Sequence, residues 1–167
     1  MAKKDLTVTL YISELIYDVH NKTYLTGRSR NNGSNHEETA YMQTNDDEEE
    51  KNQIVRSLGN AFATLKTKLS EYLFLTDTTS DNELLDSSTN LTLSLSMPSN
   101  YNQSTADSIA QCAHRYLVNS AIGEWFTITN KVDANDYAAL ANVNLAELRE
   151  AINKRVRPTR SDVTKDS

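Results

Sequence analysis

The sequence predicts a mostly α protein: an antiparallel helix bundle with a small β-ribbon and long polar extensions. Three observations lead to this fold class. Apolar residues recur at helical spacing in several long segments, they alternate with polar residues over 91–97, and other stretches contain almost none. Only 38% of the 167 residues are apolar, below the roughly 45–50% of ordinary globular domains. We therefore expect one domain with a real core and segments that need a partner for order.

We expect three regions along the chain. Residues 1–53 should form an N-terminal helix and an acidic polar extension. Residues 54–157 should form the helical core, with the β-ribbon at about 73–97, and 158–167 should form a C-terminal tail. The length suits a single domain, and the sequence contains no internal repeat.

The first apolar segment fits two patterns. Leu6, Val8 and Leu10 alternate as in a strand, whereas Val8, Ile12 and Leu15 also fit the spacing of a helix. The helical interpretation over about 10–26 is preferred, with Gly27 as its stop. A short strand before this helix remains an alternative.

Residues 28–50 are polar and predict a loop. Positions 31–50 contain seven acidic residues and no Lys or Arg. The acids of 46–50 directly precede a helical pattern over about 48–73, and carboxylates stabilise the positive end of a helix dipole. This is the preferred explanation of the acidic run, and a metal site or a site for a basic partner is the alternative.

Two strands are expected after this helix. Residues 73–77 and 91–97 should pair as the β-ribbon, joined by a turn-rich connection, and Pro98 should end the second strand. A lone two-stranded ribbon is only marginally stable in water, so we expect it to pack on a helix or to extend a neighbouring sheet. The apolar positions of the second strand are Leu91, Leu93, Leu95 and Met97.

The last two helices should form an antiparallel pair. One is expected to begin near Ser104 or Thr105 and to continue to Trp125, at a helix–helix junction. The other should begin with Asp133 as its cap and end before Pro158. The short connection TITNKV favours antiparallel packing. The strongest core is expected among the last three helices.

No residue pattern predicts catalysis, and we expect neither an enzyme nor a cofactor. The sequence has no glycine-rich phosphate loop and no nucleophile motif. Cys112 and His114 are two positions apart on a helix, too far around its axis for one metal ion, and His20 and His36 have no suitable co-ligand. Paired acids such as Asp133 and Asp136 are expected to be solvated.

The cationic segment near the C-terminus is the main candidate site. It consists of Lys154, Arg155, Arg157 and Arg160, in a chain of formal net charge −6. Three interpretations remain open: charges that complement a helix C-terminus, a docking segment for another protein, or a contact with DNA phosphates. The acidic pI of about 5.1 argues against a general nucleic-acid binder.

The layout resembles head–tail connector, or adaptor-ring, proteins of tailed bacteriophages, including ring proteins of crAss-like phages of Bacteroides. The resemblance covers roughly 54–160: a long helix, a ribbon ending at LSMPSNY, a helix pair with AIGEWFTITNKVDANDY, and the tail NKRVRPTR. It implies a homo-oligomeric ring, often twelve-fold, that docks on the portal and on neighbouring tail or ring proteins around the DNA channel. Non-specific DNA contact would follow from that position. The implied location is the virion, after assembly in the bacterial cytoplasm, with no membrane contact.

The resemblance also implies roles for two sets of residues. Lys154, Arg155, Arg157 and Arg160 would be the partner-docking tail. The ribbon residues Leu91, Leu93, Leu95 and Met97 would be an intersubunit element. Two rival functions stay open, a phage tail-completion or terminator protein and a small helical regulator that binds a single protein partner.

Overall fold

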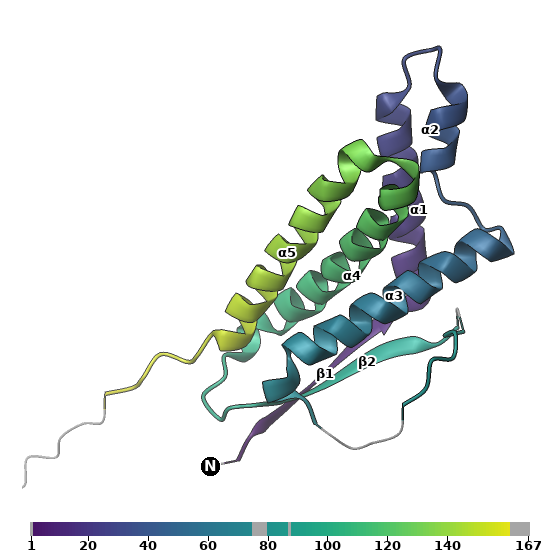
Figure 1. Cartoon of the computed structure of the whole chain (residues 1–167). Coiled ribbons are helices and arrows are strands. Elements are labelled where there is room, and N and C mark those ends of the chain that lie inside the picture. Colours follow the sequence, from purple (N-terminus) through teal and green to yellow (C-terminus); the bar gives the residue numbers. More distant parts are fainter. Residues whose placement is uncertain (1, 75–79, 87, 161–167) are drawn as a thin grey trace, which may run out of the picture.

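The computed structural model describes residues 2–74, 80–86 and 88–160. Within them the protein is mostly helical, with five helices and a small antiparallel sheet (Figure 1). Two 3-10 turns, Ser70–Tyr72 and Gln103–Thr105, flank the second strand and its connection. The main elements in chain order are β1 (Lys4–Tyr11), α1 (Ile12–Arg30), α2 (His36–Met42), α3 (Glu48–Lys68), β2 (Asn90–Met97), α4 (Ala106–Thr129) and α5 (Lys131–Asn153).

The sheet pairs the N-terminal strand with β2. β1 and β2 are antiparallel, from Lys4 opposite Met97 to Tyr11 opposite Asn90. The alternation of β1 buries Val8 and Leu10 and exposes Thr7 and Thr9, so the strand alternative at the N-terminus is confirmed and α1 begins at Ile12 rather than at about residue 10.

The predicted pairing of 73–77 with 91–97 is present at its start, but the main partner of β2 is β1, which pairs with it along its whole length. Leu73 makes a single antiparallel bridge to Leu95 on the other side of β2. Residues 75–77 of the predicted strand lie outside the described residues.

The region predicted as a polar loop contains a helix. α1 continues through Gly27 to Arg30, so the expected stop at Gly27 is wrong. Gly27 is instead the point where α2 crosses α1: a Cβ there would lie 2.7 Å from the carbonyl oxygen of Thr39. Gly33, with φ of 89°, forms the turn between the two helices. Glycine at residue 27 therefore permits a close helix–helix approach.

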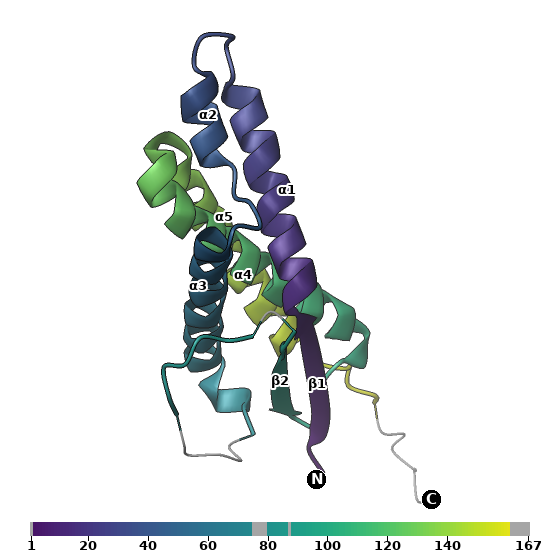
Figure 2. The same cartoon turned by 90° about the vertical axis from the view of Figure 1, so that its right-hand side faces the viewer.

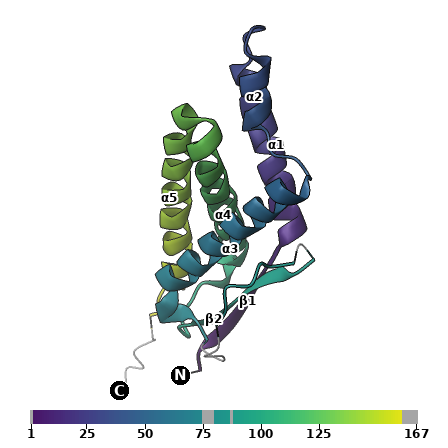
Figure 3. The same cartoon turned by 45° about the vertical axis from the view of Figure 1, so that its right-hand side comes forward.

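α3 lies across the ribbon and α4 (Figure 3). It begins at Glu48 as predicted, with acidic residues in its first turn, and ends at Lys68, five residues before the predicted end. The chain then tightens into the 3-10 turn at Ser70–Tyr72. The buried face of α3 includes Ile54, Leu58 and Leu65, the residues whose spacing predicted the helix.

α4 and α5 are antiparallel neighbours, joined through Asn130 (Figures 1 and 3). The start of α4 after Ser104 and Thr105 is confirmed. The predicted cap of α5 is wrong: the side chain of Asn130 accepts from the backbone N–H of Asp133 and caps the helix three residues earlier. Phe126 and Tyr137 pack edge to face between the helices, with ring centroids 5.3 Å apart.

One hydrophobic core connects these elements. The expected core of α3, α4 and α5 is extended by β1, β2 and α1, which contribute residues such as Val8, Leu15 and Leu93. Trp125 lies at the edge of this core and is half-buried, and its indole N–H donates to the carbonyl oxygen of Met42 at 2.9 Å. Trp125 therefore joins α4 to the end of α2.

The described molecule is elongated. The α1–α2 hairpin projects beyond the other helices at one end, and both ends of the described chain leave from the opposite end (Figure 2). The start of α3 lies nearer the hairpin, and the extension after α5 points away from it (Figure 1). This arrangement separates the acidic segment from the cationic segment in space.

Candidate partner-docking site

The root of the cationic segment is held by the end of α5. Lys154 is the C-cap residue of that helix, and its ammonium lies 3.1 Å from the carboxylate of Glu150. The guanidinium of Arg155 donates to the carbonyl oxygen of Ile152 at 2.8 Å and to that of Lys154 at 3.2 Å. Cations at a helix C-terminus stabilise its unpaired carbonyl groups. These two residues therefore serve the helix end.

A short backbone ladder fixes the direction of the chain after α5. Arg155 and Tyr101 form an antiparallel bridge. The N–H of Asn102 donates to the carbonyl oxygen of Lys154 at 3.1 Å, and the N–H of Val156 donates to that of Asn100 at 2.8 Å. Tyr101 is buried in the core. The extension thus leaves the body as extended chain from a rigid base.

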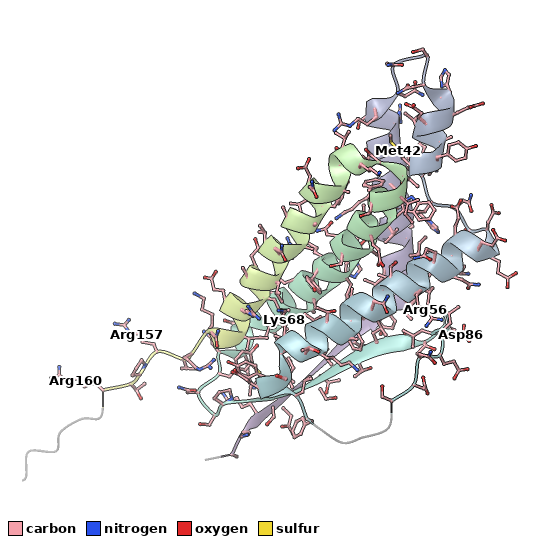
Figure 4. All side chains as sticks on the ribbon, viewed as in Figure 1. Met42, Arg56, Lys68, Asp86, Arg157 and Arg160 are labelled. Carbon is pink, nitrogen blue, oxygen red and sulfur yellow. The ribbon has the colours of Figure 1, made fainter. Side chains whose placement is uncertain are left out.

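Arg157 and Arg160 are the members of the cationic segment that remain available. Both are exposed, and their side chains point away from the helices (Figure 4). Of the four residues predicted to dock a partner, Lys154 and Arg155 bind groups at the end of α5, and Arg157 and Arg160 lie on the extended chain. We call Val156–Arg160 the C-terminal arm.

The acidic segment lies at the far end, on α2 and at the start of α3 (Figure 1). Glu37 and Glu38 occupy the first turn of α2. Asp46 lies 3.1 Å from the Nε2 of His20, and the carboxylate of Glu50 accepts from the N–H of Asn45 at 2.9 Å. Part of the acidic run thus closes the connection between α2 and α3, and the rest faces solvent.

The apolar side chains of the ribbon face the core of their own chain. These side chains are buried inside the chain, at most 4% exposed, and pack in the core. The alternation correctly predicted that one face of β2 is apolar. It could not predict that this face is covered by the core of the same chain. Any intersubunit contact of the ribbon has to use other atoms. The four residues are Leu91, Leu93, Leu95 and Met97.

A polar seam that the sequence did not reveal joins α1 to the α4–α5 pair. Arg30 binds the carboxylate of Asp133 through two nitrogens, and the amide of Asn130 donates to the same carboxylate at 2.6 Å. The Arg30 hydrogen bond lowers the pKa of Asp133 below its ordinary value, although burial opposes this effect. The hydrogen bond to Asp133 likewise raises the pKa of Arg30. Asp133, expected in solvent, is therefore a buried ion-pair partner.

Two further hydrogen bonds continue this seam. The hydroxyls of Thr26 and Tyr137 are 2.7 Å apart. The buried amide of Asn119 donates to Asn144 at 2.7 Å. The polar positions of an amphipathic helix are expected to face solvent. These buried hydrogen bonds between helices could therefore not be predicted from the sequence.

The histidines and the cysteine have structural partners. His114 pairs with Asp18 of α1, and His20 contacts Thr44 at 2.6 Å. Burial raises the pKa of the Cys112 thiol above its ordinary value. Among the residues that the structure describes, no three His, Cys, Asp or Glu side chains form a group that could hold a metal ion.

Comparison with protein-family models, with curated proteins and with solved structures gives no match for this chain. No described helix combines the length and the apolar character needed to cross a bilayer. Inferences about function therefore rest on the surfaces described above.

Proposed function

We propose that this protein is a structural subunit of a head-to-tail connector ring in a tailed-phage virion, docked on the portal around the DNA channel. The observation that carries the proposal is the placement of opposite charges at opposite ends of one elongated molecule. Arg157 and Arg160 lie on an arm at one end, and the acidic residues of α2 and α3 lie toward the other.

This charge distribution favours head-to-tail contact between identical subunits. The arm points away from the acidic residues of its own chain, so complementary contact requires another molecule. A contact between two different surfaces of identical subunits repeats from copy to copy, and it forms a ring when the rotation closes. The same arm can dock on an acidic surface of a portal or of a neighbouring tail or ring protein. Exposed ion pairs mainly steer and select such partners.

The helical body would act as the rigid part of each subunit. In this proposal α3, α4 and α5 work as an antiparallel bundle, and the arm and the α1–α2 hairpin make the contacts. DNA contact is secondary, because two of the four residues of the cationic segment, Arg157 and Arg160, would be free to meet phosphates. The subunit would reside in the virion after assembly in the host cytoplasm.

Native mass spectrometry of the purified chain, alone and mixed with the portal protein, tests this proposal. We expect a closed homo-oligomer, with twelve copies as the expected number, or a complex that forms when the portal is added. A monomer that ignores the portal would contradict the proposal and favour the small regulator that binds a single partner.

The same measurement separates the connector from its rival within the virion. A tail-completion or terminator protein would also form a ring, but this ring would bind tail-tube subunits and leave the portal free. We favour the connector because the arm and the acidic end give each subunit two dissimilar docking surfaces, as a ring between two other rings requires.

A further inference from the structure

Strand β1 has a free edge whose hydrogen-bonding groups can be assigned from the sheet register. The N–H of Phe74 donates to the carbonyl oxygen of Ser94 at 3.0 Å, on the side of β2 away from β1. The N–H and C=O of one residue in an antiparallel strand point to the same side, and neighbouring residues alternate. The backbone N–H and C=O of Ser94 therefore point away from β1, and those of Leu93 and Leu95 point toward it. Their partners in the register are Val8 and Leu6.

The other residues of β1 consequently direct their backbone groups away from the sheet. Ahead of Tyr11, which caps α1, these residues are Asp5, Thr7 and Thr9, and their side chains are exposed. In the part of the chain that the structure describes, β2 is the one strand paired with β1, and these outward groups make no backbone hydrogen bond to another segment. An unpaired edge of this kind is a template for a strand from another chain.

The C-terminal arm has the backbone of such a strand. Its first residue, Val156, already pairs with Asn100 in extended conformation, and Pro158 keeps the residue before it extended. Proline has no N–H and is tolerated in an added strand where this position faces away from the partner. The N–H groups of Arg157 and Thr159 then face the partner strand together.

We infer that the free edge of β1 binds the C-terminal arm of a second copy of this chain, as an added antiparallel strand. The inference rests on the proposed function and specifies the contact between neighbouring subunits. In one register the outward backbone groups of β1 and the partner-facing backbone groups of the arm can all form hydrogen bonds. This register places Arg157 opposite Thr9 and Thr159 opposite Thr7. At about 3.4 Å per residue, the arm from 156 to 160 is as long as about five of the 8 residues of β1.

The charges around the edge match those of the arm. Asp5 is exposed on the edge itself. Beyond Thr9, a depression of about 420 Å³ is lined by Glu14 and Asp18 of α1 as well as by Tyr11. In the proposed register the guanidinium of Arg157 reaches this depression.

Lys4 and His114 also lie near this edge of β1, and both already have partners. Lys4, at the start of β1, donates to the carbonyl oxygen of Tyr101, and His114 pairs with Asp18. Glu14, in the first turn of α1, and Asp5 are left to attract the arm. The main contribution to binding in strand addition comes from backbone hydrogen bonds, so these charges set the register and the orientation.

Two proline substitutions test this contact from its two sides. Thr7→Pro removes an outward N–H of β1 without removing a β1–β2 hydrogen bond, and Thr159→Pro removes an inward N–H of the arm. The matched controls, Thr7→Val and Thr159→Val, keep both N–H groups. We expect each proline variant to be monomeric by native mass spectrometry, with unchanged circular dichroism, while the controls assemble like the unmodified chain.

Mixing the two proline variants gives the decisive measurement. Thr7→Pro keeps a functional arm and Thr159→Pro keeps a functional edge, so an equimolar mixture should form dimers and nothing larger. Thr159→Pro changes only the exposed arm, so it tests the inference even if Thr7→Pro does not fold. Assembly of Thr159→Pro would overturn the inference, and loss of assembly in Thr7→Pro alone would indicate β1–β1 pairing instead.

The unmodified chain and the two proline variants together distinguish failure of the arm–edge contact from failure of the connector function. Assembly that survives both substitutions rejects the arm–edge contact and leaves the connector ring standing. An unmodified chain that stays monomeric but binds the portal likewise rejects the arm–edge contact and is compatible with the connector function. A monomer that ignores the portal rejects both.

Discussion

Asp133 shows at the scale of single residues what the sequence could not reveal. Its position next to a helix start suggested a solvated cap, and local spacing contains no sign of its partner. Arg30 is 103 residues away along the chain, and the two meet because α1 packs beside the α4–α5 turn. Contacts between distant segments of this kind follow from the tertiary arrangement alone.

The substitution Asp133→Asn should destabilise the protein by about 1.5–3 kcal/mol at neutral pH, the range for hydrogen bonds to charged groups. The folded-state pKa of Asp133 is lowered, so the carboxylate stabilises the fold above its unfolded-state pKa of about 3.9. This stabilisation decreases as the pH falls through the folded-state value. Urea melts at several pH values measure the difference.

The unmodified protein and Asp133→Asn should therefore differ by a constant amount above about pH 5 and converge as the pH falls from about 4 through the lowered folded-state pKa of Asp133. Asp136→Asn, on the same helix at an exposed position, is the matched control and should change stability little. A pH-independent difference for Asp133→Asn would show that the ion pair does not account for the loss.

At the scale of elements, periodicity predicted the long helices and failed where two elements share a surface. α3, α4 and α5 each show an apolar stripe, and they were recognised with errors of a few residues at their ends. α2 is short and buries little besides Thr39, so it has no stripe to detect. The pairing of β1 with β2 joins residues from 79 to 93 positions apart in the chain, and the local pattern contains no information on it.

Gly27 offers a test of one of these shared surfaces. A methyl group at residue 27 would collide with the backbone carbonyl of Thr39, so Gly27→Ala should push α2 from α1 and cost about 1–3 kcal/mol. Thermal unfolding followed by circular dichroism measures this loss. It should also shift the fluorescence of Trp125, which hydrogen-bonds the end of α2.

Gly59→Ala is the matched control for this experiment. Gly59 lies inside α3, and an added Cβ would meet only the side chain of Leu85, at 3.4 Å. Alanine is favoured over glycine in a helix interior by about 1 kcal/mol, so this variant should be as stable as the unmodified protein or more stable. Equal losses for Gly27→Ala and Gly59→Ala would contradict the close-approach explanation.

At the scale of the whole molecule, the relevant feature is the distance between the arm and the acidic end. The sequence located both charged segments correctly but could not place them relative to each other. It also could not divide the four cations into two that hold α5 and two that are free, because this division depends on backbone contacts with Tyr101 and Ile152.

Reversing the free charges should weaken assembly and leave the fold unchanged. We expect Arg157→Glu with Arg160→Glu to reduce self-association or portal binding at least tenfold at low salt, measured by sedimentation velocity. Added salt should reduce the difference in affinity between this variant and the unmodified chain, because exposed charges are screened over about 10 Å at 0.1 M ionic strength.

The control for charge reversal is Lys68→Glu with Lys131→Glu, which makes the same change in net charge at exposed positions that do not belong to the arm. If this control weakens association equally, net charge and not the arm is responsible. A loss of helical content in the arm variant would indicate damage to the end of α5.

The two ends of the described chain leave from the same end of the molecule (Figure 2), and this has a practical consequence. An affinity tag or a fluorescent protein fused ahead of β1 would lie on the side of the molecule from which the arm leaves, and would hinder association that the untagged chain shows. The turn at Gly33 stands at the opposite end of the molecule (Figure 2). A short epitope inserted there would allow purification and imaging while leaving the proposed contact surfaces uncovered.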